Sequence, residues 1–164
     1  MLPLVKQVGQ NLIRRGFMLA SAESCTGGLL GEAATAISGS SAWYERGFIT
    51  YSNASKCEML GVRSSTLEQY GAISEQTAQE MAAGAIIRSH AQVSVAITGI
   101  AGPTGGTIIK PVGMICFAWA VKAGLARSQT RHLSGDRQEI RQQSVIIALQ
   151  GILDLLHETP AGIA

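Results

Sequence analysis

Charge is scarce in this chain: charged residues make up 15% of its 164 positions, and aromatic residues only 5%. With 46% hydrophobic residues, 19 glycines and four prolines, this composition excludes a disordered chain and a coiled coil. The longest apolar run, at 112–121, is far shorter than the ~20 residues that a membrane-spanning helix needs. The length fits one domain over residues 1–164, large enough to fold without disulfides or a metal ion.

Metal-ligating residues are also few. Aspartate occurs only at Asp136 and Asp154, the three histidines are scattered, and the three cysteines form no CxxC pair. Magnesium, calcium and zinc sites therefore have few ligands to draw on, and a disulfide framework is equally disfavoured. We expect chemistry without a metal ion or another cofactor.

The charge balance and the N-terminus limit the partners and the compartment. The 13 basic and 11 acidic residues leave a net charge of +2, too mild to indicate a nucleic-acid partner. Lys6, Arg14 and Arg15 lie near the N-terminus, but no long apolar stretch precedes a small-residue cleavage site, so no signal peptide is predicted. We expect a cytoplasmic protein with no membrane partner.

Apolar spacing predicts helices that alternate with strands. Helices are expected at 4–15, 29–37, 54–60, 74–90 and 136–157, and strands at 17–22, 48–51, 93–97, 112–121 and 127–133. Asn53 and Ser74 are the expected N-caps of their helices, and Gly16 and Gly61 end the helices before them. This order predicts an α/β protein, a three-layer α/β/α sandwich around a mostly parallel or mixed sheet.

The first candidate for chemistry is the turn at 22–28, between a strand and a helix. Its small residues let a ligand approach the backbone, and free N–H groups at the helix start would face an anion or an oxyanion. Ser24, Cys25 and Thr26 offer three nucleophile types in a row. The alternative is an ordinary tight turn.

The second candidate, at 48–56, ends on Lys56, one of four lysines in the chain. A lysine near a serine can act as its general base if burial lowers the pKa of the amine. The position, one turn into a helix that follows a strand, is where α/β proteins place active sites. The alternative is a solvent-exposed helix lysine.

Two further segments are candidates for ligand binding, a loop and the start of a helix. The segment at 98–106 holds four glycines in nine residues, which favours a functional loop over a long turn. At the start of the last helix, Arg137 and Arg141 share one helix face, with Arg127 and Arg131 just upstream, which suits a phosphate. The alternative there is a solvated basic patch, partly neutralised by nearby acidic residues.

All four segments occur together, in this order, in one family. The chain resembles the CinA C-terminal domain family, which includes the stand-alone nicotinamide-nucleotide amidases. The matching motifs are AESCTGG at 22–28, GSSAWYERGFITYSNASK at 39–56, LGV at 60–62, GAISE at 71–75, TGIAGP at 98–103, KPVG at 110–113 and SGDR at 134–137. The resemblance spans about residues 5–156, nearly the whole chain.

The resemblance implies a metal-independent serine amidohydrolase, with Ser24 as nucleophile, Lys56 as general base and Tyr51 as a helper that hydrogen-bonds within the pair. It would convert nicotinamide mononucleotide to nicotinic acid mononucleotide and ammonia, in pyridine nucleotide recycling. The residues expected to bind substrate are Thr26, Gly27, Gly28, Thr98, Gly99, Arg137 and Arg141. The oxyanion hole is expected from the backbone N–H groups of 26–28. A homo-oligomer, most simply a dimer, is also expected.

The chain departs from the family pattern in one loop. Members commonly read DGG followed by acidic residues, whereas this chain has Thr-Gly-Gly-Thr-Ile-Ile at 104–109. A charged loop has become apolar, which bears on substrate specificity. Two other functions stay open on the sequence: a catalytically inactive or regulatory nucleotide-binding module, and a partner protein associated with competence or DNA damage.

Overall fold

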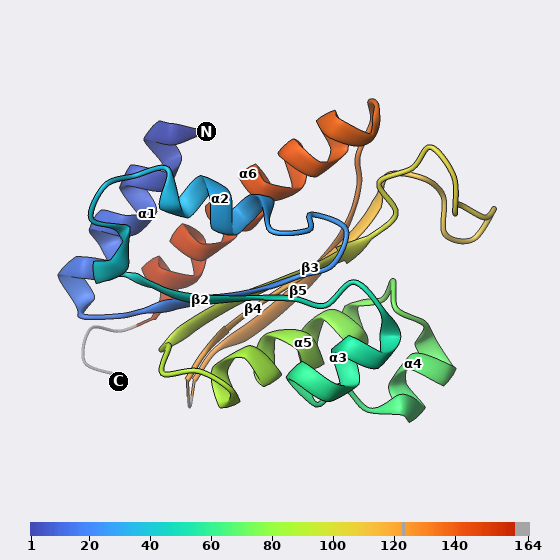
Figure 1. Cartoon of the computed structure of the whole chain (residues 1–164), viewed down its shortest axis with the longest axis horizontal. Helices are drawn as coiled ribbons and strands as arrows, with labels where there is room; N and C mark the ends of the chain where they lie inside the picture. The colour runs from blue at the N-terminus through green and yellow to red at the C-terminus, as the bar shows by residue number, and fades with distance from the viewer. Residues whose placement is uncertain (123, 160–164) are drawn as a thin grey trace.

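A five-stranded mixed sheet forms the middle layer of the molecule (Figure 1). The computed structural model describes residues 1–122 and 124–159. The strands are β1 (Leu19–Glu23), β2 (Tyr44–Ile49), β3 (Val93–Gly99), β4 (Met114–Val121) and β5 (Ala126–His132). Their order is β2-β1-β3-β4-β5; the first three are parallel, and β4 and β5 are antiparallel to the strands before them.

Helices cover both faces of this sheet (Figure 1). One face carries α1 (Leu2–Arg15), α2 (Leu29–Thr35) and α6 (Arg137–Glu158), and the other carries α3 (Asn53–Leu60), α4 (Ser64–Tyr70) and α5 (Glu75–Ile87). A 3₁₀ turn, η1 (Ser40–Ala42), precedes β2. The predicted three-layer α/β/α sandwich is confirmed.

The two faces of the sheet differ in bulk because side chains alternate along each strand. On β4, Phe117 and Trp119 join the large core beneath α1, α2 and α6, whereas Cys116, Ala118 and Ala120 face α5. The facing side of α5 is built mostly of alanines. Small residues on both surfaces let α5 pack close to the sheet.

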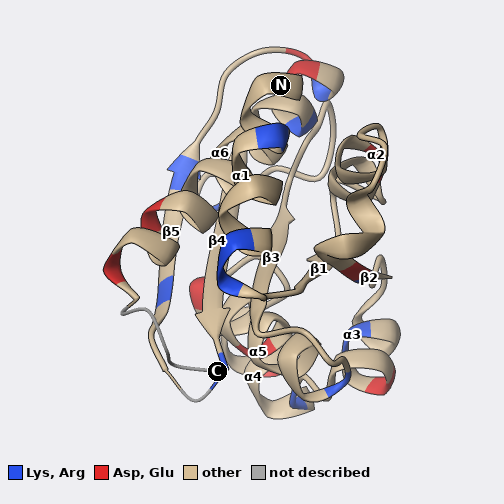
Figure 2. Ribbon diagram, turned by 90° about the vertical axis from the view of Figure 1, so that its left-hand side faces the viewer, with Lys and Arg blue, Asp and Glu red and all other residues tan. Residues whose placement is uncertain are grey.

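Charged residues are spread thinly over this fold. Figure 2 shows basic residues on several helices and strands, separated by uncharged residues and accompanied by acidic ones. Among the described residues, three arginines form ion pairs: Arg46 with Glu45, Arg63 with Glu80, and Arg127 with Glu158. In the described part of the chain, every helix is too short or too polar to cross a membrane.

Several predicted boundaries need correction. The helix over 64–70 was not expected, because its sequence has no apolar stripe; the Glu80 carboxylate caps it by accepting hydrogen bonds from the Arg63 amide and the Thr66 hydroxyl. The N-cap of α3 is Ser52 rather than Asn53, because the Ser52 hydroxyl accepts from the Ser55 amide and completes a capping box. Strand β2 lies at Tyr44–Ile49, earlier than the expected 48–51.

Strand β1 is the point at which the strand order reverses. From β1 the chain passes through α2 to β2 on one side, then through α3, α4 and α5 to β3 on the other side. Open α/β sheets bind ligands outside the carboxyl ends of their strands at such a point. The turn that follows β1, at 24–28, belongs to the first candidate segment from the sequence, 22–28.

The position of α3 depends on a close approach to α5 at Gly84. Leu60 is the last residue of α3, and a Cβ atom at Gly84 would lie 2.0 Å from its carbonyl oxygen. We expect Gly84→Ala to lower the free energy of unfolding by about 1–3 kcal/mol, measured by urea denaturation, because a backbone atom must move. Ala83→Ser, on the exposed side of the same helix, is the control and should stay within about 0.5 kcal/mol of wild type. Equal stabilities of the two variants would contradict this packing argument.

Candidate active site

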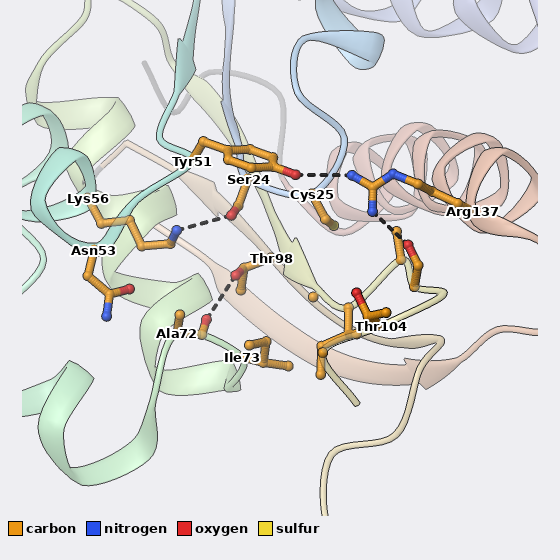
Figure 3. A pocket seen from close by; sticks show the side chains of 15 residues that line it. Ser24, Cys25, Tyr51, Asn53, Lys56, Ala72, Ile73, Thr98, Thr104 and Arg137 are labelled. Atoms are coloured by element: carbon orange, nitrogen blue, oxygen red, sulfur yellow. Dashed lines mark hydrogen bonds between the residues drawn. The ribbon is translucent and has the colours of Figure 1, made fainter. Parts of the chain in front are cut away.

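A cleft of about 310 Å³ opens at the carboxyl ends of β1 and β3, where the strand order reverses (Figure 3). Four separate parts of the chain line it: the turn after β1, the segment from 51 to 56, residues 72–73 before α5, and the end of β3 with the loop that follows. The start of α6 closes one side through Arg137. Six of the sequence-predicted site residues line this cleft, namely Ser24, Tyr51, Lys56, Thr98, Gly99 and Arg137.

Strand geometry orients the Ser24 hydroxyl. The Ser24 amide donates to the Ile97 carbonyl oxygen at 2.9 Å, so it continues the pairing of β1 with β3 by one residue. Successive side chains point to opposite faces, so Ser24 faces the side of α3 and α5, and Glu23 faces α2. The Lys56 Nζ donates to the Ser24 Oγ at 3.0 Å and to the Thr50 carbonyl oxygen at 2.8 Å.

Lys56 is a buried lysine, only 1% exposed, and not the solvent-exposed helix residue that the sequence alone also allowed. Burial lowers the pKa of its amine below the ordinary 10.5, because water no longer solvates the charged form. A neutral amine at this distance can take the proton of the Ser24 hydroxyl. The pair therefore has the geometry of a nucleophile beside its general base.

The neighbouring thiol is not suited to be the nucleophile. Burial raises the pKa of the Cys25 thiol from 9.0 to about 12, so the thiolate, its reactive form, is scarce at neutral pH. The Ser24 hydroxyl is also hydrogen-bonded to the Lys56 amine, which supplies the base that a hydroxyl needs. Of the three adjacent nucleophile types, the structure favours the serine.

Tyr51 and Arg137 meet across the mouth of the cleft (Figure 3). The Arg137 guanidinium donates to the Tyr51 hydroxyl at 3.0 Å and to the Gly102 carbonyl oxygen at 2.8 Å. The expectation that Tyr51 hydrogen-bonds within the Ser24–Lys56 pair needs correction, because the Tyr51 hydroxyl accepts its hydrogen bond from Arg137 instead. Tyr51 is 62% exposed, so its ring forms part of the rim.

Thr98 and Gly99 form the wall of the cleft at the end of β3. The Thr98 hydroxyl donates to the Ala72 carbonyl oxygen at 2.8 Å and so holds the segment before α5 against the cleft. A Cβ atom at Gly99 would lie 2.6 Å from the Met114 carbonyl oxygen, so only glycine lets β3 and β4 meet here.

The remaining predicted residues, Thr26, Gly27, Gly28 and Arg141, do not line the cleft. Arg141 donates to the carbonyl oxygens of Cys25 and Thr26, at 3.2 and 2.8 Å, and thus braces the turn from α6. Its predicted place on a substrate phosphate needs correction, because its guanidinium is committed to this backbone.

The predicted oxyanion hole at 26–28 also needs revision. The Gly27 amide donates to the Ser24 carbonyl oxygen, and the Gly28 amide donates to the Glu23 carboxylate. Within residues 1–122 and 124–159, the amides of Cys25 and Thr26 donate to no other residue. Because C=O and N–H point in opposite directions in a trans peptide, these amides point away from Gly27 and Arg141, which hold the paired carbonyls. These two amides are the ones in this turn that have no acceptor among the described residues.

Three contributions to the site were not expected from the sequence. The Thr50 carbonyl oxygen fixes the amine of Lys56, the Gly102 carbonyl oxygen fixes Arg137, and Glu23 caps α2. The carbonyl contacts leave no sequence signal, because every residue carries this group. Asn53 also lines the cleft, since Ser52 takes its expected capping role.

A serine hydroxyl beside a buried lysine amine, at the ligand-binding end of an α/β sheet, is the arrangement expected of a serine nucleophile with a lysine base. The CinA C-terminal domain family matches residues 1–156, so this chain belongs to that family. The family resemblance stated from the sequence motifs is confirmed.

Individual relatives cover nearly all of the chain. Nicotinamide-nucleotide amidohydrolase PncC of Escherichia coli K12 is 49% identical over 150 residues, which cover 92% of this chain and 91% of that protein. A CinA-like protein of Chloroherpeton thalassium is 45% identical over 95% of this chain, which covers only 38% of that longer protein. The crystal structure of the competence/damage inducible protein CihA from Agrobacterium tumefaciens is 44% identical and superposes with a TM-score of 0.91, covering 95% of this chain and 94% of that one.

The Ser24–Lys56 pair can be tested with a fluorophosphonate, which forms a P–O bond to a reactive serine hydroxyl as its P–F bond breaks. We expect the rate of Ser24 labelling to fall as the pH is lowered through the reduced pKa of Lys56, because only the neutral amine can take the proton. Lys56→Arg should label at a negligible rate at every pH, since a guanidinium stays protonated. Lys6→Arg, on the surface of α1, is the matched control and should label like wild type. Rapid labelling of Lys56→Arg would contradict the base role.

Proposed function

We propose that this protein is a metal-independent amidohydrolase that converts nicotinamide mononucleotide to nicotinic acid mononucleotide and ammonia. The observation that carries the reaction is the 3.0 Å contact between the Ser24 hydroxyl and the buried amine of Lys56. The substrate is supported by relatives named nicotinamide-nucleotide amidohydrolase, about half identical over nine-tenths of the chain.

In the first half of the reaction, the Ser24 Oγ attacks the carboxamide carbon while Lys56 takes the hydroxyl proton. The amides of Cys25 and Thr26 hold the negative oxygen of the tetrahedral intermediate. Lys56 then returns the proton to the leaving nitrogen, which departs as ammonia and leaves an acyl group on Ser24. The balance is one amide bond broken and one ester bond formed.

In the second half, a water molecule takes the place of ammonia. Lys56 accepts a proton from this water, which attacks the ester, and the proton passes back to the Ser24 oxygen as the carboxylic acid leaves. No step requires a metal ion. Release of ammonia from nicotinamide mononucleotide, unaffected by exhaustive chelation, is the direct test, and a folded protein that binds the nucleotide without releasing ammonia would instead be a regulatory module.

The phosphate of the substrate is assigned to Arg137. Apart from Lys56, it is the only cationic side chain among the described residues that line the cleft. It lies on the rim, with hydrogen bonds to two neutral oxygens, Tyr51 Oη and Gly102 O, so no carboxylate competes with a phosphate in these contacts. Arg127, one of the arginines upstream, pairs with Glu158 instead.

The predicted homodimer stays a prediction.

The nucleophile is tested by two adjacent substitutions. We expect Ser24→Ala to abolish ammonia release while the nucleotide still binds, because the base is left without a hydroxyl to activate. Cys25→Ser should retain substantial activity, since the buried, protonated thiol takes no part in the reaction. The measurement is the initial rate of ammonia release, with binding followed by calorimetry. An active Ser24→Ala beside an inactive Cys25→Ser would exchange their roles.

The phosphate assignment is tested by comparing the mononucleotide with its dephosphorylated riboside. A charge-assisted hydrogen bond contributes roughly 1.5–3 kcal/mol, about ten- to a hundred-fold in affinity. We expect kcat/KM to favour the mononucleotide by at least that factor, and Arg137→Ala to remove most of the preference. Arg131→Ala, at an exposed position of β5, is the control that should keep it. A preference unchanged in Arg137→Ala would place the phosphate elsewhere, and the loop at 99–106 would be the next segment to test.

A further inference from the structure

Glu23 is a buried carboxylate next to the nucleophile that the reaction above does not use. It is 1% exposed and accepts three backbone hydrogen bonds, from Gly28 (3.0 Å), Leu30 (3.1 Å) and Gly31 (3.0 Å). The Ser21 hydroxyl adds a longer contact at 3.4 Å. A buried carboxylate is costly unless it is hydrogen-bonded or paired. In residues 1–122 and 124–159 it has no ion pair, so backbone amides carry this compensation.

These amides belong to the start of α2, which has no side-chain cap of its own. The N-cap position is Gly28, with φ at 100°, and it has no side chain that could accept a hydrogen bond. The first amides of a helix need acceptors from outside the helix. Glu23 supplies them from the end of β1, and this contact spans the whole turn that carries Ser24.

The turn is therefore fixed at both ends. At its start, the Glu23 carbonyl oxygen accepts from the Thr50 amide and the Ser24 amide donates to Ile97. At its end, the Glu23 side chain holds Gly28. Between these anchors lie the nucleophile and the two amides assigned to the oxyanion hole, so a shift of Gly28 would be transmitted to all three.

We propose that Glu23 is a positioning residue, whose carboxylate holds the nucleophile turn in the geometry that aligns the Ser24 hydroxyl with Lys56. The proposal rests on the proposed function, because it assigns Glu23 a part in the same reaction. Glu23 acts through the backbone and not through its charge, since its side chain faces α2, on the opposite side of β1 from the amine of Lys56.

The chemistry of the contact requires a carboxylate of this length. In Glu23→Gln, one acceptor oxygen becomes an NH₂ donor that meets a backbone N–H, so at least one α2 amide loses its partner. Glu23→Asp keeps both oxygens but is one methylene shorter, so the turn must move to meet it. A misplacement of about 1 Å can cost on the order of 10²-fold in rate.

The test measures the fluorophosphonate labelling rate of Ser24 and the kcat and KM of ammonia release for wild type, Glu23→Asp and Glu23→Gln. We expect labelling and kcat to fall at least about tenfold in Glu23→Gln, and less in Glu23→Asp, with KM changed little because the cleft wall is intact. The pH at which labelling rises should stay where it is in wild type, since the charge of Glu23 does not act on Lys56.

The matched control is Glu80→Gln. Glu80 also caps a short helix, since its carboxylate accepts hydrogen bonds from the Arg63 amide and the Thr66 hydroxyl, but it does not line the cleft. We expect Glu80→Gln to lower the melting temperature without slowing the labelling of Ser24. An equal loss of labelling in both variants would reduce Glu23 to a general stabiliser of the fold and overturn the proposal.

The remaining outcomes separate this proposal from the proposed function. Wild-type kinetics in folded Glu23→Gln would overturn the positioning role alone. If Glu23→Gln does not fold, Glu23→Asp decides, and wild-type labelling by that variant would overturn the proposal. A wild-type protein that neither labels at Ser24 nor releases ammonia would refute the proposed function itself, and with it any part for Glu23.

Discussion

The burial of Lys56 is the constraint on which the rest of the proposed site depends, because a lysine that remains charged cannot accept the proton of Ser24. Lys56 lies in the first turn of α3 and is only 1% exposed. The Thr50 carbonyl oxygen satisfies the amine without giving it a negative charge. A carboxylate in that place would stabilise the protonated form and raise the pKa instead of leaving it low.

Different elements of the fold supply the different groups that surround the cleft. The end of β1 and the start of α3 hold the Ser24–Lys56 pair, whereas the start of α6 presents Arg137 at the mouth and Arg141 behind the nucleophile turn. Because α6 reaches both the rim and the turn, the arginine that lines the cleft and the arginine that braces the turn belong to one helix. The loop after β3 closes the remaining side, and its tip, which carries the exposed Ile108 and Ile109, takes no part in the core.

Much of the fold could be predicted from the sequence, since apolar spacing marks the helices that face the large core and the strands buried between layers. Helix α4 was missed because Leu67 is its one residue packed against a core cluster, and its start is held by a glutamate 17 residues from Arg63. In the site, the motifs indicated Ser24 and Lys56, but burial of the amine depends on tertiary packing that no local pattern records.

The two arginines show the same limit. Residues four apart on a helix are offset by about 40° and ~6 Å, which is enough to place Arg137 in the cleft and Arg141 on the backbone behind it. Whether a backbone amide is free also depends on side chains outside the turn: the Glu23 carboxylate takes the Gly28 amide, and neither residue alone signals the contact.

Because side chains alternate between the two faces of β1, the site is sensitive to the register of this one strand. Glu23 and Ser24 are neighbours in the chain yet face opposite layers, so the strand itself insulates a carboxylate from an amine. A slip of β1 by one residue would exchange the two side chains. The carboxylate would then meet Lys56 as an ion pair and the hydroxyl would face α2, so the same residues in the same order would form a salt bridge in place of a nucleophile and its base.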